Sequence, residues 1–136
     1  EIINKKIKKR ESFRPFAPSV LREDVAKLFE QNIDSPFMMH VVKFKEEFRN
    51  TFPAVTHVDG TGRLQTVDKE NNALYYQLIK AVKKRTGFGI ILNTSFNENE
   101  PVVETPEQAI ACFDRTGMDV LVMGNFIITK NGQNVA

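Results

Sequence analysis

The sequence has little of several features that would mark a protein's class at once. Its 136 residues include one cysteine, Cys112, and no tryptophan. A single cysteine excludes an internal disulfide and fits a reducing compartment, so we expect a cytoplasmic protein. No apolar run approaches the roughly 20 residues that a transmembrane helix needs, and no secretory signal is present. We therefore expect no membrane partner.

The charge balance is equally modest. The formal net charge is +2, too small to demand nucleic acid or a membrane surface, although five of the first ten residues are Lys or Arg. With two tyrosines and no tryptophan, the chain offers few rings for base stacking. Nucleic acid is thus not the expected partner, but a non-catalytic RNA-binding or docking module stays open as the alternative. The sequence contains no Walker-type loop and no dinucleotide fingerprint.

The length and the 41% hydrophobic content predict a single domain over residues 1–136. Strand and helix patterns alternate, which predicts an α/β (α+β) fold. The predicted strands are 38–44, 54–58, 63–67, 89–93, 120–123 and 126–129, the last two joined by a Gly124-Asn125 turn. The predicted helices are 22–32, 71–84 and one that begins at Thr105-Pro106 with a capping box to Gln108.

The most informative polar residues follow the apolar strand 89–93. They are Asn93, Thr94, Ser95 and Asn97. Loops at strand ends are where α/β sheets bind ligands, and hydroxyl and amide groups together can recognise a planar carbamoyl or carboxyl group. The alternative is that these common turn formers only satisfy nearby backbone groups.

Cations that an anionic ligand would need occur in two other segments. Arg63 follows a polar loop that contains His57, Asp59 and Thr61, and its guanidinium could hold a phosphate or carboxylate in a bidentate manner. The alternative is a solvated arginine. His57 and Asp59 are too few for a metal site, so we expect no metal ligands in this chain.

The second source of cations is the N-terminal cluster with Lys8, Arg10 and Arg14. A terminal charge run is usually a solvated tail. Here the apolar and rigid residues 13–18 follow at once, so we expect Arg14 to be held by a packed segment. Cys112 has no neighbouring base and no helix-start position, so we expect it in the core and not as a nucleophile.

Four stretches of the sequence form a recognisable set: residues 10–19 (RESFRPFAPS), 53–61 (PAVTHVDGT), 92–97 (LNTSFN) and 105–107 (TPE). Together they resemble the C-terminal region of the carbamoyltransferase family of nodulation and antibiotic-tailoring enzymes. The resemblance implies a single YrdC-like domain with a twisted mixed sheet and flanking helices. It also implies that carbamoyl phosphate and ATP are converted here into carbamoyladenylate. A metal-binding, actin-like N-terminal domain of the same polypeptide, outside these residues, would then carbamoylate a hydroxyl acceptor.

The resemblance also implies roles for individual residues. The K-x-R pattern of YrdC-type domains falls on Lys8 and Arg10, the S-x-N pattern on Ser95 and Asn97, and the arginine after the Asp-Gly-Thr turn is Arg63. We expect Arg63, Ser95 and Asn97 to be catalytic, by positioning and electrostatics. The expected substrate-binding residues are Lys8, Arg10, Arg14, His57, Asp59, Thr61, Asn93 and Thr94. Mg²⁺ is expected with ATP, bound mainly through phosphates and waters.

Overall fold

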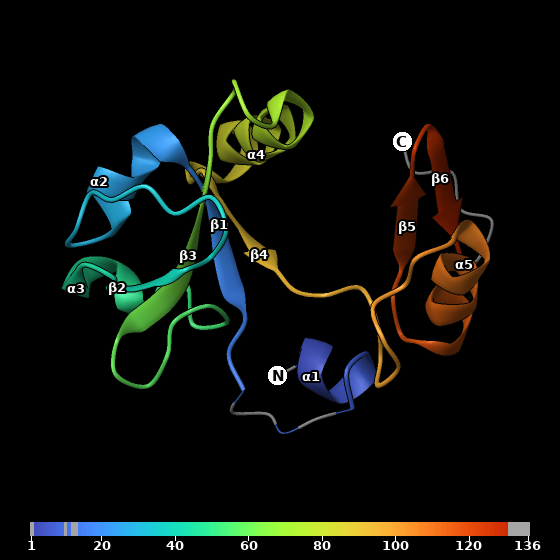
Figure 1. The fold of residues 1–136 in the computed structure, drawn as a ribbon. Helices are drawn as coiled ribbons and strands as arrows, with labels where there is room; N and C mark the ends of the chain where they lie inside the picture. Colours follow the sequence, from blue (N-terminus) through green and yellow to red (C-terminus); the bar gives the residue numbers. More distant parts are fainter. Residues whose placement is uncertain (1, 10, 12–13, 131–136) are drawn as a thin grey trace. The chain divides into compact units, whose positions relative to one another are not determined.

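The computed structural model describes residues 2–9, 11 and 14–130. Contacts divide the chain into two compact units, Pro15–Thr94 and a second made of Glu1–Arg14 with Ser95–Ala136. Figure 1 shows both, and each is described by itself below. The predicted mixed α/β class is confirmed, whereas one domain over residues 1–136 stays a prediction. In the described residues no helix is both long and apolar enough to cross a membrane.

The unit Pro15–Thr94 is built on a four-stranded mixed sheet. Its strands are β1 (Ala17–Leu21), β2 (His40–Lys43), β3 (Thr61–Val67) and β4 (Ile90–Asn93). Their order is β2-β3-β1-β4; β1 is parallel to β3 and antiparallel to β4, and β2 is antiparallel to β3. The predicted strands 38–44, 63–67 and 89–93 correspond to β2, β3 and β4.

The central strand β1 was not predicted from the sequence, because it contains Pro18. Proline lacks the N–H that a ladder needs, and it is tolerated near the start of a strand. Pro18 precedes the three pairs that β1 forms with β3, which run from Ser19 with Gln65 to Leu21 with Val67. All five residues of β1 are buried, as expected of a strand with a neighbour on each side.

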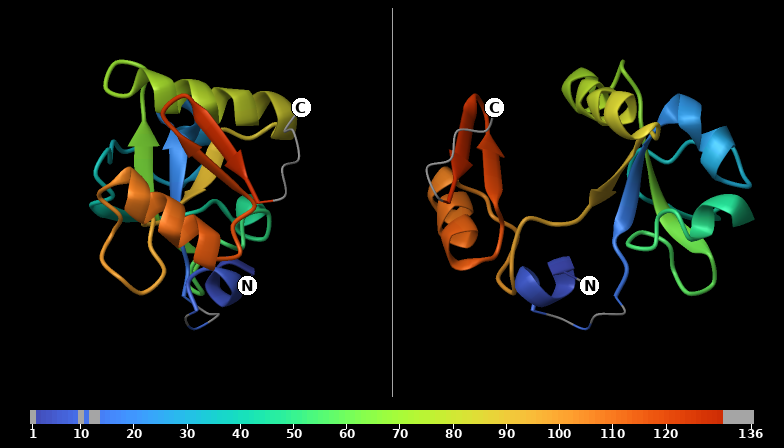
Figure 2. Two further views of the ribbon diagram at one scale, coloured as in Figure 1. Left: turned by 90° about the vertical axis from the view of Figure 1, so that its right-hand side faces the viewer. Right: turned by 180° about the vertical axis from the view of Figure 1, so that it is seen from behind.

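Helix α4 (Ala73–Thr86) lies two residues later than predicted and runs across the end of the sheet at which β1 and β3 terminate (Figure 2). It begins where the Asn72 side chain accepts a hydrogen bond from the Tyr75 N–H, and it ends at Gly87 with φ of +83°. Ile79 from its inner face packs with Leu21 and Val67 in the core. The helix therefore closes one end of one sheet face.

The predicted helix 22–32 is shorter in the structure. A 3₁₀ turn η1 (Arg22–Asp24) leads into α2 (Val25–Leu28), and the backbone becomes extended at Phe29. Phe29 forms an isolated antiparallel bridge with Phe44, and the ring centroids lie 4.2 Å apart. This buried aromatic contact overrides the helical periodicity that the sequence shows.

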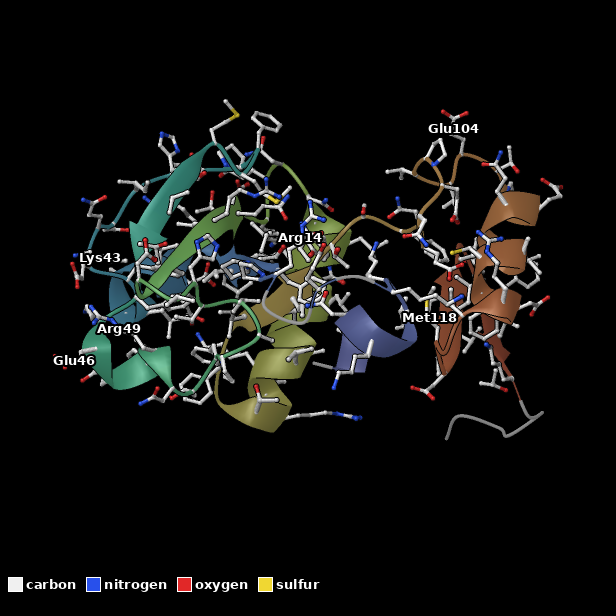
Figure 3. The ribbon with its side chains drawn as sticks, turned by 90° about the horizontal axis from the view of Figure 1, so that it is seen from below. Arg14, Lys43, Glu46, Arg49, Glu104 and Met118 are labelled. Atoms are coloured by element: carbon white, nitrogen blue, oxygen red, sulfur yellow. The ribbon has the colours of Figure 1, made fainter. Side chains whose placement is uncertain are left out.

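The predicted strand 54–58 is wrong. After α3 (Glu46–Arg49) the chain turns, with the Val55 N–H donating to the Phe52 carbonyl at 3.1 Å. Gly60 has φ of +80° against the side chain of Arg49, which is labelled in Figure 3. Gly62 is needed for space instead, since a Cβ there would lie 2.7 Å from Phe44 Cε2. The turn that contains these glycines therefore leads directly into β3, and the predicted strand 54–58 before it does not form.

The second unit contains α1 (Ile2–Lys6), α5 (Pro106–Arg115) and a hairpin of β5 (Val120–Met123) and β6 (Phe126–Thr129). The hairpin confirms the prediction, with antiparallel pairs from Val120–Thr129 to Met123–Phe126. Thr105 caps α5 by accepting from the Gln108 N–H at 3.3 Å. The Gln108 side chain in turn accepts from the Glu104 N–H at 2.8 Å, one residue earlier than a capping box predicts. Cys112 is fully buried, as predicted.

Candidate functional site

One face of the four-stranded sheet carries a row of polar side chains. Along β3, Arg63, Gln65 and Val67 alternate onto the same face. The strand register places Ser19 of β1 beside Gln65, and Ile91 and Asn93 of β4 on that face. Tyr75, Tyr76 and Ile79 of α4 pack against the end with Leu21 and Val67. The helix thus covers the apolar end, and the polar row lies next to it.

A directed chain of hydrogen bonds fixes the polar row. Tyr75 Oη donates to Ser19 Oγ at 2.9 Å, and Ser19 Oγ donates to Gln65 Oε1 at 2.6 Å. Asn93 Nδ2 donates to the same Gln65 oxygen at 2.7 Å. Gln65 Nε2 donates to the Pro36 carbonyl at 3.2 Å. Asn93, a predicted site residue, therefore positions the Gln65 amide. The sequence did not indicate Ser19, Gln65 or Tyr75, because their meeting depends on the unrecognised strand β1.

Arg63 is the cation on this face. It is exposed, and its strand neighbour across the sheet is Val41. Within the described residues its guanidinium has no hydrogen-bond or ion-pair partner. Because alternate residues of a strand are about 6–7 Å apart, the Arg63 backbone lies that far from Gln65. An unoccupied guanidinium beside amide groups can hold a phosphate or carboxylate in a bidentate manner.

His57, Asp59 and Thr61 form a closed turn immediately before Arg63. Thr61 Oγ1 lies 2.7 Å from Asp59 Oδ1 and 3.0 Å from His57 Nδ1, and the Thr61 N–H donates to Asp59 at 3.0 Å. The hydrogen bonds from Thr61, side chain first and then backbone, lower the pKa of Asp59. These three predicted residues are brought together by the structure, and their polar groups hold one another. They shape the turn from which Arg63 projects.

In the second unit, Lys8 contacts Ser95 and Asn97, which follow it in the sequence by 87 and 89 positions. Lys8 is 3% exposed. Its Nζ donates to the Ser95 carbonyl at 2.5 Å, the Asn97 carbonyl at 2.8 Å and Asn97 Oδ1 at 2.7 Å, and it lies 3.2 Å from Ser95 Oγ. Ser95 Oγ donates to Asn97 Oδ1 at 2.6 Å. The two sequence patterns K-x-R and S-x-N are thus joined through one buried ammonium group.

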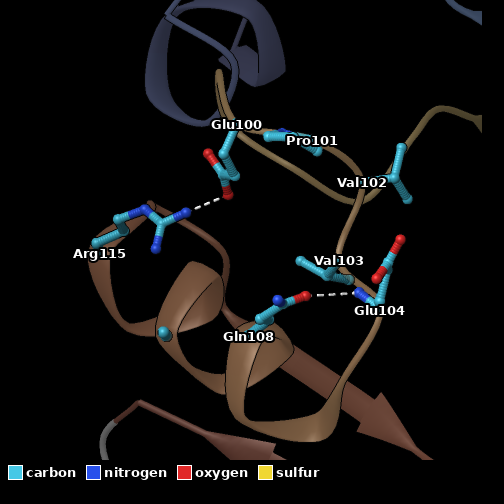
Figure 4. A pocket seen from close by; sticks show the side chains of 8 residues that line it. Glu100, Pro101, Val102, Val103, Glu104, Gln108 and Arg115 are labelled. Atoms are coloured by element: carbon cyan, nitrogen blue, oxygen red, sulfur yellow. Dashed lines mark hydrogen bonds and ion pairs between the residues drawn. The ribbon is translucent and has the colours of Figure 1, made fainter.

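A carboxylate cluster that the sequence did not indicate adjoins this contact. Glu98 pairs with Lys9 at 2.5 Å and with Arg115 at 3.2 Å, and Glu100 also pairs with Arg115. Lys9 first, and then Arg115, lower the pKa of Glu98. Hydrogen bonds from backbone N–H groups, its own first, lower the pKa of Glu100 to about 2. Glu100 and Arg115 border a pocket of about 690 Å³ on α5 (Figure 4). The sequence showed no signal that links the loop after β4 to Arg115.

The remaining predicted residues are placed as follows. Arg10 lies outside the described residues. Arg14, labelled in Figure 3, is exposed. It is held through its backbone: its carbonyl accepts from Asn4 Nδ2 at 2.8 Å and its N–H donates to the Glu11 carbonyl at 3.3 Å. Thr94 is exposed. Over residues 2–9, 11 and 14–130, no three His, Cys, Asp or Glu side chains gather in a way that could hold a metal ion.

Comparison with known proteins identifies the family of this chain. The sequence profile described as "Carbamoyltransferase C-terminus" matches residues 1–130. The chain therefore belongs to the carbamoyltransferase family and represents its C-terminal region.

Named relatives agree with this assignment. The chain is 51% identical to nodulation protein NolNO of Sinorhizobium fredii over 132 residues, which cover 94% of this chain and 19% of that protein. It is 50% identical to nodulation protein NolO of Bradyrhizobium diazoefficiens, covering 94% and 24%. It is 33% identical to the 3'-hydroxymethylcephem-O-carbamoyltransferase of Amycolatopsis lactamdurans, covering 88% and 23%. The chain thus spans about a fifth to a quarter of the length of these relatives.

Proposed function

We propose that this chain is the part of an O-carbamoyltransferase that binds carbamoyl phosphate and ATP and forms carbamoyladenylate. Membership of the carbamoyltransferase family supports the reaction class. The structural observation that supports the proposal concerns Arg63. Its guanidinium has no partner among the described residues and lies on the same sheet face as Gln65 and Asn93. Such a face offers a positive charge and amide groups to a ligand that is both anionic and carbamoylated.

The proposed chemistry has two steps. Water releases inorganic phosphate from carbamoyl phosphate, and a carbamate oxygen then attacks the α-phosphorus of ATP, with pyrophosphate as the leaving group. In this scheme Arg63 neutralises charge that builds on the oxygens. In the actin-like N-terminal domain of the longer polypeptide, the hydroxyl oxygen of the acceptor would then attack the carbamoyl carbon, with AMP as the leaving group and the hydroxyl proton released.

Mg²⁺ would accompany ATP as the ion of the nucleotide. It prefers octahedral oxygen coordination and keeps several waters when phosphates supply the other ligands. The described residues provide no dedicated group of metal ligands. The buried, reduced Cys112 supports the cytoplasm as the proposed compartment.

Titration calorimetry of the full-length protein with carbamoyl phosphate, with and without Mg²⁺ and a non-hydrolysable ATP analogue, tests the proposal. A bidentate charge-assisted contact contributes about 1.5–3 kcal/mol, so Arg63→Ala should weaken binding about 10- to 100-fold. Arg85→Ala is the matched control, because Arg85 is an exposed arginine in the last turn of α4. Equal affinity of wild type and Arg63→Ala would refute the proposed site.

A further inference from the structure

Helix α4 has two apolar stripes, although its unit buries only one of them. Ile79 lies in the core of the unit, whereas Leu74 and Leu78 are 81% and 53% exposed. At about 100° of rotation per residue, the two leucines lie about 140° and 100° around the helix from Ile79 and therefore point away from the core. A surface helix normally has a single apolar stripe, so the second stripe indicates a contact surface.

The exposed stripe has the spacing of a coiled-coil seam. Leu74, Leu78, Ala81 and Arg85 follow one another at intervals of four, three and four residues, and all of them are exposed. The first three are apolar, and the small side chain of Ala81 lets another helix come close. The stripe therefore fits a second helix better than an extended segment.

The two ends of this stripe carry opposite charge. Lys84 and Arg85 in the last turn of α4 are exposed and form no ion pair within the described residues. The turn just before the helix contains Asp68, Lys69 and Glu70, that is, two acidic groups and one basic group. Glu70 is exposed, and its carboxylate also has no ion-pair partner in the described part of the chain. The stripe is thus complementary in charge to a reversed copy of itself.

These charges decide how a second copy of α4 would be oriented. In a parallel pair, Lys84 and Arg85 would lie beside the same two residues of the partner subunit and repel them. An antiparallel pair places them beside the acidic turn instead, and it brings opposite ends of the helix dipoles together. With a two-fold axis near Leu78, Leu74 lies against Ala81 of the partner subunit, so that a large side chain meets a small one.

From these observations we propose that α4 is the contact surface of a homodimer, in which the stripe of Leu74, Leu78 and Ala81 packs antiparallel on its own copy. A two-fold contact uses the same patch twice, so each pair between Lys84 and Glu70 of the partner subunit forms twice. The helix has 14 residues and is about 21 Å long, so the interface is small. We therefore expect a dissociation constant in the micromolar range. The inference does not depend on the proposed function.

Sedimentation velocity of the full-length protein, over concentrations from about 0.1 to 100 µM, tests the dimer. The wild type should shift from monomer to dimer within this range. Leu78→Glu places two carboxylates at the two-fold axis and should weaken the dimer more than tenfold. Leu78 is exposed, so the variant should keep its fold, as circular dichroism would verify.

A charge exchange separates this antiparallel pair from other contacts. Lys84→Glu turns two attractive surface pairs into two repulsive ones and should weaken the dimer about tenfold. The double variant Lys84→Glu with Glu70→Lys should restore the dimer to within about threefold of wild type. Lys80→Glu is the matched control: Lys80 is an exposed lysine of α4 on the side away from the stripe, so its replacement should leave the dimer unchanged.

Three results would overturn the proposal. The first is a wild type that stays monomeric at all these concentrations. The second is a dimer that Leu78→Glu does not weaken, because another surface would then hold the copies together. The third is a monomer whose urea midpoint falls on Leu78→Glu, since another part of the same polypeptide would then cover the stripe. A dimer that is lost with Lys84→Glu and restored in the double variant supports the antiparallel contact.

Discussion

Replacing Lys8 with methionine should destabilise the unit that contains Ser95 and Asn97. Methionine keeps most of the apolar stem but removes the ammonium group, which four oxygens of these two residues surround within 3.2 Å. A hydrogen bond to a charged group contributes about 1.5–3 kcal/mol, and such contributions do not add when they share one donor. Ser95 is exposed, so water can replace Lys8 at some of these oxygens. We therefore expect a loss of about 3 kcal/mol.

Urea denaturation of the 136-residue chain measures this loss. With a slope of about 1–3 kcal/mol per molar, the midpoint should fall by roughly 1–3 M. Because the chain forms two units, hydrogen exchange should locate the effect in residues 2–9 and 95–103. Lys9→Met is the matched control: Lys9 is 60% exposed and pairs with Glu98, which also holds Arg115, so its loss should cost about 0–1 kcal/mol. Equal urea midpoints for the two variants would refute a stabilising role of the buried Lys8 ammonium group.

Three further predictions concern stability in acid, the reactivity of Cys112 and the space around Gly89. The folded pKa of Glu98 is lowered and that of Glu100 lies at about 2, below the model-compound value of 4.5, so the unfolded chain takes up protons first as the pH falls. Their stabilising effect should be complete above about pH 4.5 and vanish toward pH 2; an acid-insensitive urea midpoint would contradict this. Burial, and then Glu100, raise the pKa of Cys112, so maleimide should label the native chain far more slowly than the unfolded chain. A Cβ at Gly89 would lie 2.2 Å from Asp24 Oδ2, so Gly89→Ala should destabilise by about 1–3 kcal/mol, and an unchanged thermal midpoint would show that this estimate is wrong.

Local signals in the sequence predicted the elements that depend on neighbouring residues alone. The long apolar periodicity of α4, the Thr105-Pro106 start of α5 and the Gly124-Asn125 turn of the last hairpin all occur in the structure. Each of these elements is stabilised by contacts between residues a few positions apart, so the local sequence is enough to predict it. The roles of Arg63, Ser95 and Asn97 in binding stay predictions.

The errors have a common physical origin in pairing between distant segments. Residues 54–58 have the composition of a strand but no partner strand, and the chain turns there. Residues 17–21 contain Pro18 and are nevertheless central, because β3 and β4 both pair with them. Strand preference is largely a preference for a suitable neighbour, which the sequence of one segment does not contain.

The sequence by itself determined the mixed α/β class, the family and the residue types available for binding an anion. Only the tertiary structure decided which of them meet. It buried Lys8 between Ser95 and Asn97, left Arg63 exposed, and aligned Tyr75, Ser19, Gln65 and Asn93 into one hydrogen-bonded row. These contacts join residues 28 to 89 positions apart. They follow from strand register and helix packing, which fix directions in space that no local pattern specifies.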